Sequence, residues 1–84
     1  MRVTEMKKGT VVFINDLFEK HNILAEPEYL NNRAEKGTSG VLRKPLTHDN
    51  SVWWVEHEGG VQAPYWYSEL VKSPGNMKPE WLEK

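Results

Sequence analysis

One stretch, residues 52–70, most constrains the fold, because it combines two strand-like runs with a glycine turn between them. Val52–His57 and Val61–Tyr67 are rich in β-branched and aromatic residues, and Glu58–Gly60 supplies the tight turn of a β-hairpin. The stretch holds three of the four tryptophans and two of the three tyrosines. So small a domain cannot easily bury that much aromatic surface. We therefore expect a small β-barrel that presents aromatic side chains to a ligand.

The composition fits one small domain in a reducing compartment. The 84 residues include no cysteine, so neither a disulfide nor a thiolate metal site can stabilise the fold. Eleven basic and twelve acidic residues give a net charge of −1, whereas proteins that coat DNA are usually strongly basic. No stretch resembles a signal peptide or reaches the roughly 20 apolar residues of a membrane span. We therefore expect a soluble, cytoplasmic protein.

Turn signals divide the chain into three parts. Residues 1–8 are polar and predict a flexible lead, and Gly9 opens a barrel that we expect to span residues 9–72. The Ser-Pro-Gly-Asn cluster at residues 73–76 then begins a tail over residues 73–84, which we expect to end in one helical turn around Trp81.

The predicted barrel strands surround one long loop at residues 15–35. Asp16 and Glu19 have the spacing of a helix N-cap and its reciprocal carboxylate, and Pro27 suits the first position of a helical turn. Long loops of this kind are usually functional. Besides the two hairpin strands, the sequence predicts the strands Thr10–Ile14 and Val41–Lys44 and a 3₁₀ turn with a short last strand over residues 68–71.

The alternation of side chains along the first hairpin strand separates its two tryptophans. Trp53 and Val55 fall on one face, and Trp54 and Glu56 on the other. Because valine favours the core and glutamate favours water, we expect Trp53 to point inward and Trp54 outward.

Four short motifs occur along residues 8–72 in a recognisable order. They are Lys8-Gly9-x-Val11-Val12, Gly37-Thr38-x-Gly40-Val41, Trp54-Val55-Glu56 and Ser68-Glu69-Leu70-Val71. This layout resembles the SH3-like small barrels of bacteria and plastids, which include the variable chain of ferredoxin–thioredoxin reductase and the SH3-like subunit of photosystem I. The resemblance implies an accessory subunit of a larger assembly.

Two further similarities imply different ligands. The tryptophan pair, the glycine turn and Ala63-Pro64 resemble a signalling SH3 domain, although its Ala-Leu-Tyr-Asp-Tyr signature is missing. That resemblance implies a peptide groove of Trp53, Pro64 and Tyr65 or Tyr67, with acidic Glu26 and Glu28 in the long loop. The segment of residues 36–41 is similar to the KOW-type element, which binds RNA or a polymerase.

Two sets of side chains are candidate contacts. A protein partner would bind the exposed members of the aromatic set, among which Trp54 ranks first, followed by Tyr65 and Trp66; the plainer interpretation is that these rings form the core and its rim. The basic set would hold single-stranded nucleic acid, or would simply be a solvated strand face. The aromatic set is Tyr29, Trp53, Trp54, Pro64, Tyr65 and Trp66, and the basic set is Arg33, Lys36, Arg43 and Lys44.

Other chemistries find little support in the residue spacing. The glycines lack the pattern of a phosphate-binding loop, and the scattered histidines His21, His48 and His57 predict no metal site. An ion pair of His57 with Glu56 or Glu58 in the hairpin is a candidate contact, and it would contribute little to stability if exposed. No nucleophile has a recognisable partner base, and so small a barrel seldom encloses a substrate.

The sequence therefore predicts an all-β, SH3-like, partly open small barrel of about five strands, with short helical turns in its long first loop. We expect a non-catalytic module or accessory subunit that binds a protein partner through exposed aromatics, without a cofactor. The alternative is an RNA- or single-stranded nucleic-acid-binding barrel.

Overall fold

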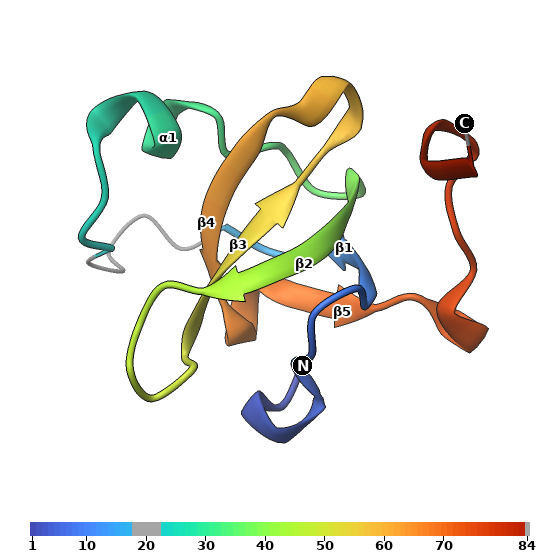
Figure 1. The fold of residues 1–84 in the computed structure, drawn as a ribbon, viewed down its shortest axis with the longest axis horizontal. Helices are drawn as coiled ribbons and strands as arrows, with labels where there is room; N and C mark the ends of the chain where they lie inside the picture. The colour runs from blue at the N-terminus through green and yellow to red at the C-terminus, as the bar shows by residue number, and fades with distance from the viewer. Residues whose placement is uncertain (18–22, 84) are drawn as a thin grey trace.

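The computed structural model describes residues 1–17 and 23–83. In these residues, five strands form one antiparallel sheet in the order β4-β3-β2-β1-β5 (Figure 1). The sheet is open, since no pairing in the described ranges joins β4 to β5. The predicted all-β, partly open barrel is confirmed. Its strands are β1 (Val11–Ile14), β2 (Ser39–Pro45), β3 (Val52–Glu56), β4 (Gln62–Trp66) and β5 (Leu70–Lys72), and its α-helix is α1 (Pro27–Asn31).

The first strand, β1, lies between β2 and β5 in the sheet. β1 pairs with β2, where Val11 lies opposite Val41, and with β5, where Ile14 lies opposite Leu70. All four of these side chains are buried. The β-branched run that predicted this strand is therefore explained by pairing on both edges, which favours side chains that pack well on a pleated surface.

The aromatic hairpin forms as predicted. Gly59 and Gly60 adopt φ values of 83° and 80°, which favour glycine, and the His57 N–H donates to the Val61 carbonyl at 2.7 Å to close the turn. The bulge in the neighbouring pairing falls at Arg43 in β2, so that the alternation of β3 is undisturbed. Trp53 is accordingly buried, at 5% exposure, while Trp54 on the other face is half-buried.

Gly40 lies in β2 where Val55 of β3 leaves no room for a side chain. A Cβ atom at this position would lie 2.3 Å from the Cγ1 atom of Val55 and 3.1 Å from the Glu56 carbonyl oxygen. The glycine is thus required by the close approach of two strands. It lies in the Gly-Thr-x-Gly-Val run that predicted β2.

We expect Gly40→Ala to lower the free energy of unfolding by about 1–3 kcal/mol, because the added methyl group overpacks the contact with Val55. Urea unfolding would measure the change. Lys44→Ala, at an exposed position of the same strand, is the control and should stay within about 0.5 kcal/mol of the parent chain. Equal midpoints for the two variants would show that β3 accommodates the methyl group without cost.

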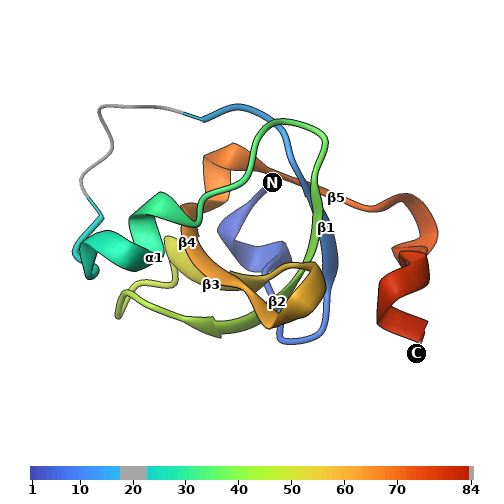
Figure 2. The same cartoon turned by 90° about the horizontal axis from the view of Figure 1, so that it is seen from above.

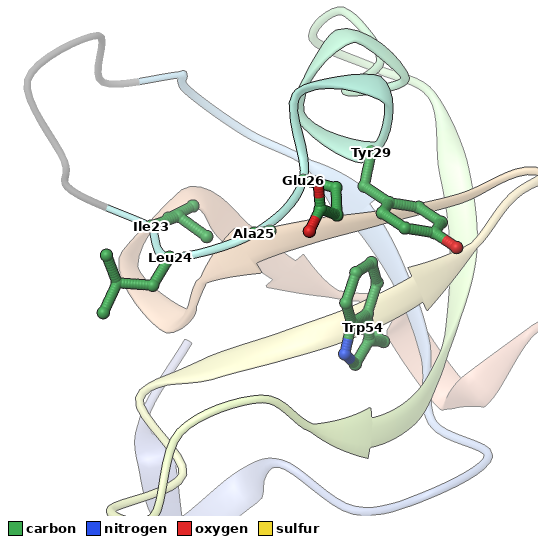
Figure 3. A pocket seen from close by; sticks show the side chains of 6 residues that line it. All are labelled: Ile23, Leu24, Ala25, Glu26, Tyr29 and Trp54. Atoms are coloured by element: carbon green, nitrogen blue, oxygen red, sulfur yellow. The ribbon is translucent and has the colours of Figure 1, made fainter.

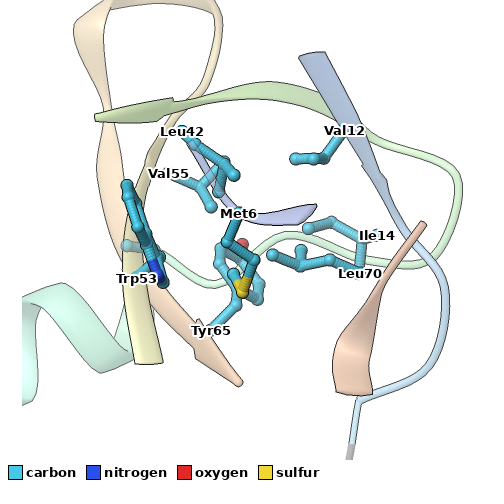
Figure 4. Close-up of a cluster of buried hydrophobic side chains, with 9 residues drawn as sticks. Met6, Val12, Ile14, Leu42, Trp53, Val55, Tyr65 and Leu70 are labelled. Carbon is cyan, nitrogen blue, oxygen red and sulfur yellow. The ribbon is translucent and has the colours of Figure 1, made fainter. Parts of the chain in front are cut away.

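The core fills the inside of the curled sheet (Figure 4). It includes Met6, which lies outside the predicted barrel boundary at residue 9 and is 6% exposed. The 3₁₀ turn Val3–Glu5 lies below the strands in Figure 1 and inside their ring in Figure 2, so this segment covers one open end. The expectation of a frayed lead is therefore wrong for Met6, because an open barrel end needs an apolar cover.

The tail folds back onto the barrel. It contains the 3₁₀ turn Glu80–Glu83, and the Trp81 Nε1–H donates to the Ser39 hydroxyl at 3.1 Å. The 3₁₀ turn Tyr67–Glu69, predicted before the last strand, is confirmed. The predicted N-cap at Asp16 with Glu19 falls partly outside the described residues. No helix in the described part of the chain has the length and apolar character to cross a membrane.

Candidate functional site

Tyr29 and Trp54 form an aromatic pair on the outside of the barrel (Figure 3). Trp54 projects from the outer face of β3, and Tyr29 reaches it from α1 in the long loop. Their ring centroids are 5.0 Å apart and their planes meet at 79°, which is an edge-to-face contact. The two residues are 25 positions apart in the sequence (54 minus 29), so the contact ties the loop to the sheet.

The local sequence explains how Tyr29 is positioned. Pro27 occupies the first turn of α1 and holds Glu26 in an extended conformation, with φ −62° and ψ 144°. The Glu26 carbonyl accepts hydrogen bonds from the Tyr29 N–H at 3.0 Å and the Leu30 N–H at 3.3 Å. The Asn32 side chain then donates to the Gln62 carbonyl at 3.4 Å, which fixes the helix to β4. The predicted helical turn at Pro27 is confirmed.

The aromatic pair forms one end of a groove of about 510 Å³, which we call the Tyr29–Trp54 groove. Leu24 is 92% exposed beside it, and Tyr29 is 36% exposed. Among the described residues, Glu26 is the only charged side chain that lines the groove. The six lining residues are Ile23, Leu24, Ala25, Glu26, Tyr29 and Trp54.

The structure divides the predicted aromatic set. It brings Tyr29 and Trp54 together, whereas Trp66 is half-buried and does not line the groove. Trp53, Pro64 and Tyr65 are buried, with Tyr65 fully inaccessible. The partner contacts that the resemblance to a signalling SH3 domain implied at these three residues are therefore wrong, whereas the inward orientation that strand alternation predicted for Trp53 is confirmed. The register of β3 and β4 explains Tyr65, because it places this ring opposite the inward-pointing Trp53. Pro64 instead lies opposite Trp54, on the strand that α1 contacts.

Tyr65 is the centre of a buried polar network. Its hydroxyl accepts a hydrogen bond from the Ala34 N–H at 2.5 Å and lies 2.8 Å from the His57 Nε2. The His57 Nδ1 lies 2.8 Å from the Ser39 carbonyl, which can only accept, so Nδ1 carries a proton; in the neutral imidazole, Nε2 then accepts from Tyr65. Burial, as the largest effect, raises the pKa of Tyr65 to about 12.

His57 therefore serves the interior of the barrel. The candidate ion pair with Glu56 or Glu58 is not what the ring forms, because His57 is only 6% exposed and both of its ring nitrogens face partners inside the fold. Within residues 1–17 and 23–83, no group of three or more His, Cys, Asp or Glu side chains is placed to hold a metal ion.

Arg33 is engaged inside the fold and is not free to contact phosphate. Its guanidinium forms an ion pair with the fully buried Glu69, and its Cζ lies 5.2 Å from the centroid of the Tyr65 ring. The other Glu69 carboxylate oxygen accepts from the Trp66 N–H at 2.9 Å. The prediction of a nucleic-acid contact at Arg33 therefore needs correction. The sequence signal that could have indicated a structural role for Glu69 is its position three residues after Trp66, whose N–H it caps at the end of a 3₁₀ turn.

The remaining predicted basic contacts are spread out and partly neutralised. The Arg43 Nε lies 3.0 Å from the Glu56 carboxylate, and the Lys36 Nζ lies 4.0 Å from the Asp16 carboxylate. Lys44 is exposed and lies opposite Trp54 in the pairing of β2 with β3. Arg43 and Lys36 thus each lie beside a carboxylate, which weakens an electropositive patch.

Sequence reasoning missed the apolar side of the groove. Ile23 and Leu24 line it, and Ile23 is buried while Leu24 is exposed. The signal that could have found them is the run of three apolar residues Ile23–Ala25 in the long loop. An exposed leucine beside exposed aromatics is typical of a surface that a partner covers.

Comparison with known proteins adds no relative to these observations: no protein-family model matches the chain, and neither a curated protein nor a solved structure matches it significantly.

Proposed function

We propose that this chain is a non-catalytic protein-binding module that docks a segment of a partner protein in the Tyr29–Trp54 groove. The observation that carries the proposal is the edge-to-face pair of the exposed Tyr29 and the half-buried Trp54, at the end of a mainly apolar groove of about 510 Å³. Tryptophan and tyrosine supply large, rigid contact surfaces and are enriched among the residues that dominate binding energy. The module would act as an accessory subunit or as a peptide-recognition unit.

The geometry supports a binding role because the two rings of the groove lie on regular secondary structure. β3 carries Trp54, and α1 is fixed to β4 by the hydrogen bond from Asn32. A groove that is already formed requires little ordering when a partner binds, which favours affinity. The absence of cysteine is typical of chains that work in a reducing compartment, and we propose the cytoplasm as its location.

The basic side chains favour protein over nucleic acid as the partner. Binding of single strands depends on cations that are free to neutralise phosphates beside stacking rings. Here Arg33 and Arg43 are paired with Glu69 and Glu56, and the groove itself carries the acidic Glu26. A negative groove repels a phosphate backbone.

We expect Trp54→Ser to abolish the retention of a stoichiometric protein partner in a pull-down from a lysate of the source organism. The lysate is treated with nuclease, and retained proteins are identified by mass spectrometry. Leu24→Asp should have the same effect, and it tests the groove without touching the fold because Leu24 is 92% exposed. Met77→Ser is the matched control, since Met77 is 71% exposed and lies in the tail.

Two outcomes would contradict the proposal. If both groove variants retain the partner as well as the parent chain does, another surface binds it. If retention disappears with nuclease and falls steeply with salt in the parent chain, phosphate contacts hold the complex and the nucleic-acid function is favoured.

A further inference from the structure

We propose that the Tyr29–Trp54 groove binds a lysine side chain of the partner protein, with its ammonium group, ordinary or methylated, in the corner between the two rings. This inference rests on the proposed function and specifies the chemistry of the docked group. It is carried by three features of the groove: the angle between the rings, the position of one carboxylate and the apolar surface next to them.

The ring geometry provides two π faces for one cation. Because the planes meet at 79° with centroids 5.0 Å apart, the rings form a corner with one face of each ring as a wall (Figure 3). The face of an aromatic ring carries the negative part of its quadrupole and attracts a cation within about 6 Å of the centroid. Tryptophan is the most effective ring for this contact. A single group in the corner can therefore contact both faces.

The charges around the corner favour a cation. Glu26 lines the groove, and in Figure 3 its carboxylate lies on the side of the loop that faces Trp54. The described residues that line the Tyr29–Trp54 groove include no lysine or arginine. Lys44 lies opposite Trp54 on β2 but does not line the groove. An incoming ammonium group thus meets one carboxylate and two π faces.

The apolar side of the groove suits the rest of a lysine side chain. Ile23, Leu24 and Ala25 continue from the aromatic corner along the loop. A lysine side chain has a hydrocarbon stem that packs on apolar surface while its charged end stays near polar groups. Methylation of the ammonium group retains the charge and makes the group easier to desolvate, and aromatic corners are suited to such quaternary ammonium groups.

The test is a titration of the full chain with two short peptides. One carries trimethyl-lysine between glycines, and the other carries its neutral isostere, in which carbon replaces the quaternary nitrogen. Binding is followed by NMR at the indole N–H of Trp54, assigned by comparison with Trp54→Phe. We expect a saturable shift at this signal, and affinity about 5- to 30-fold weaker for the neutral peptide.

Glu26→Gln and Glu28→Gln form a matched pair for the charge. Both residues are exposed and two positions apart, but only Glu26 lines the groove. We expect Glu26→Gln to weaken the trimethyl-lysine peptide by about 2- to 5-fold and to leave the neutral peptide unchanged. Glu28→Gln should change neither affinity by more than measurement error.

The results separate this inference from the proposed function. Equal affinities for the charged and neutral peptides, or no saturable shift at Trp54, would overturn the lysine proposal. If the lysine proposal fails in this way but Trp54→Ser still abolishes retention of the partner in the pull-down, the groove binds a protein through an uncharged group. If the peptide results are as expected but both groove variants retain the partner, the cation site stands and the proposed function fails.

Discussion

Arg33→Met is expected to lower the free energy of unfolding by about 3–5 kcal/mol, because it leaves the buried Glu69 carboxylate without the guanidinium that balances its charge. Methionine keeps most of the apolar stem, so the loss reports the charge and its hydrogen bonds more than the packing. Arg33 also lies over the Tyr65 ring, and this cation–π contact is lost in the same variant. Urea unfolding followed by circular dichroism measures the change.

Two further variants show whether burial is the cause. Arg43→Met breaks the ion pair of Arg43 with Glu56, in which the two side chains are 34% and 26% exposed. This variant should lower the free energy of unfolding by at most about 1 kcal/mol. Adding Glu69→Gln to Arg33→Met removes the buried charge and should restore part of the loss. If Arg33→Met and Arg43→Met are equally mild, water reaches Glu69 and the pair is not a buried one.

Tyr65→Phe is expected to lower the free energy of unfolding by about 2–4 kcal/mol. The substitution keeps the ring and removes only the hydroxyl, which leaves the Ala34 N–H and the His57 Nε2 each without the partner they have in the barrel. A buried donor or acceptor left in this way costs about 1–3 kcal/mol. Tyr67→Phe is the control, because Tyr67 is only partly buried, and it should change the free energy of unfolding by less than about 1 kcal/mol.

Tyr65 also makes the free energy of unfolding depend on pH in the alkaline range. Burial raises the pKa of Tyr65 from 10.0 to about 12, so the folded state holds the phenolic proton more tightly than the unfolded state does. This stabilisation is complete below pH 10 and is lost as the pH rises through about 12, and the full loss amounts to roughly 2–3 kcal/mol. The difference in unfolding free energy between the parent chain and Tyr65→Phe should therefore shrink over this range. A constant difference would show that the hydroxyl titrates normally.

The features that were predictable from the sequence depend on neighbours along the chain. The alternation of valine and glutamate around Trp53 and Trp54 determined which ring points inward, because side chains in a strand alternate between the two faces. The glycine pair located the hairpin turn, since only a few residues favour positive φ. The bulge that could have reversed the alternation lies in β2, where it leaves β3 unchanged.

The features that were not predictable depend on contacts between distant segments. The burial of Tyr65 follows from its position opposite Trp53, and its register needed the exact length of the turn. Arg33 and Glu69 are 36 residues apart, and nothing near either residue shows that they meet. Tyr29 and Trp54 were both candidates for partner binding, but their contact depends on how the long loop folds onto β3.

The antiparallel pairing of β1 with β5 has a mechanical consequence. Val12 lies opposite Lys72, so the chain enters the first strand and leaves the last one at the same end of the pair. A force that pulls the two ends of the protein apart therefore loads the hydrogen bonds of this pair one after another, as in a zipper, instead of all at once in shear. The barrel would open by peeling at this pair, and its resistance to pulling would be low even where its equilibrium stability is not.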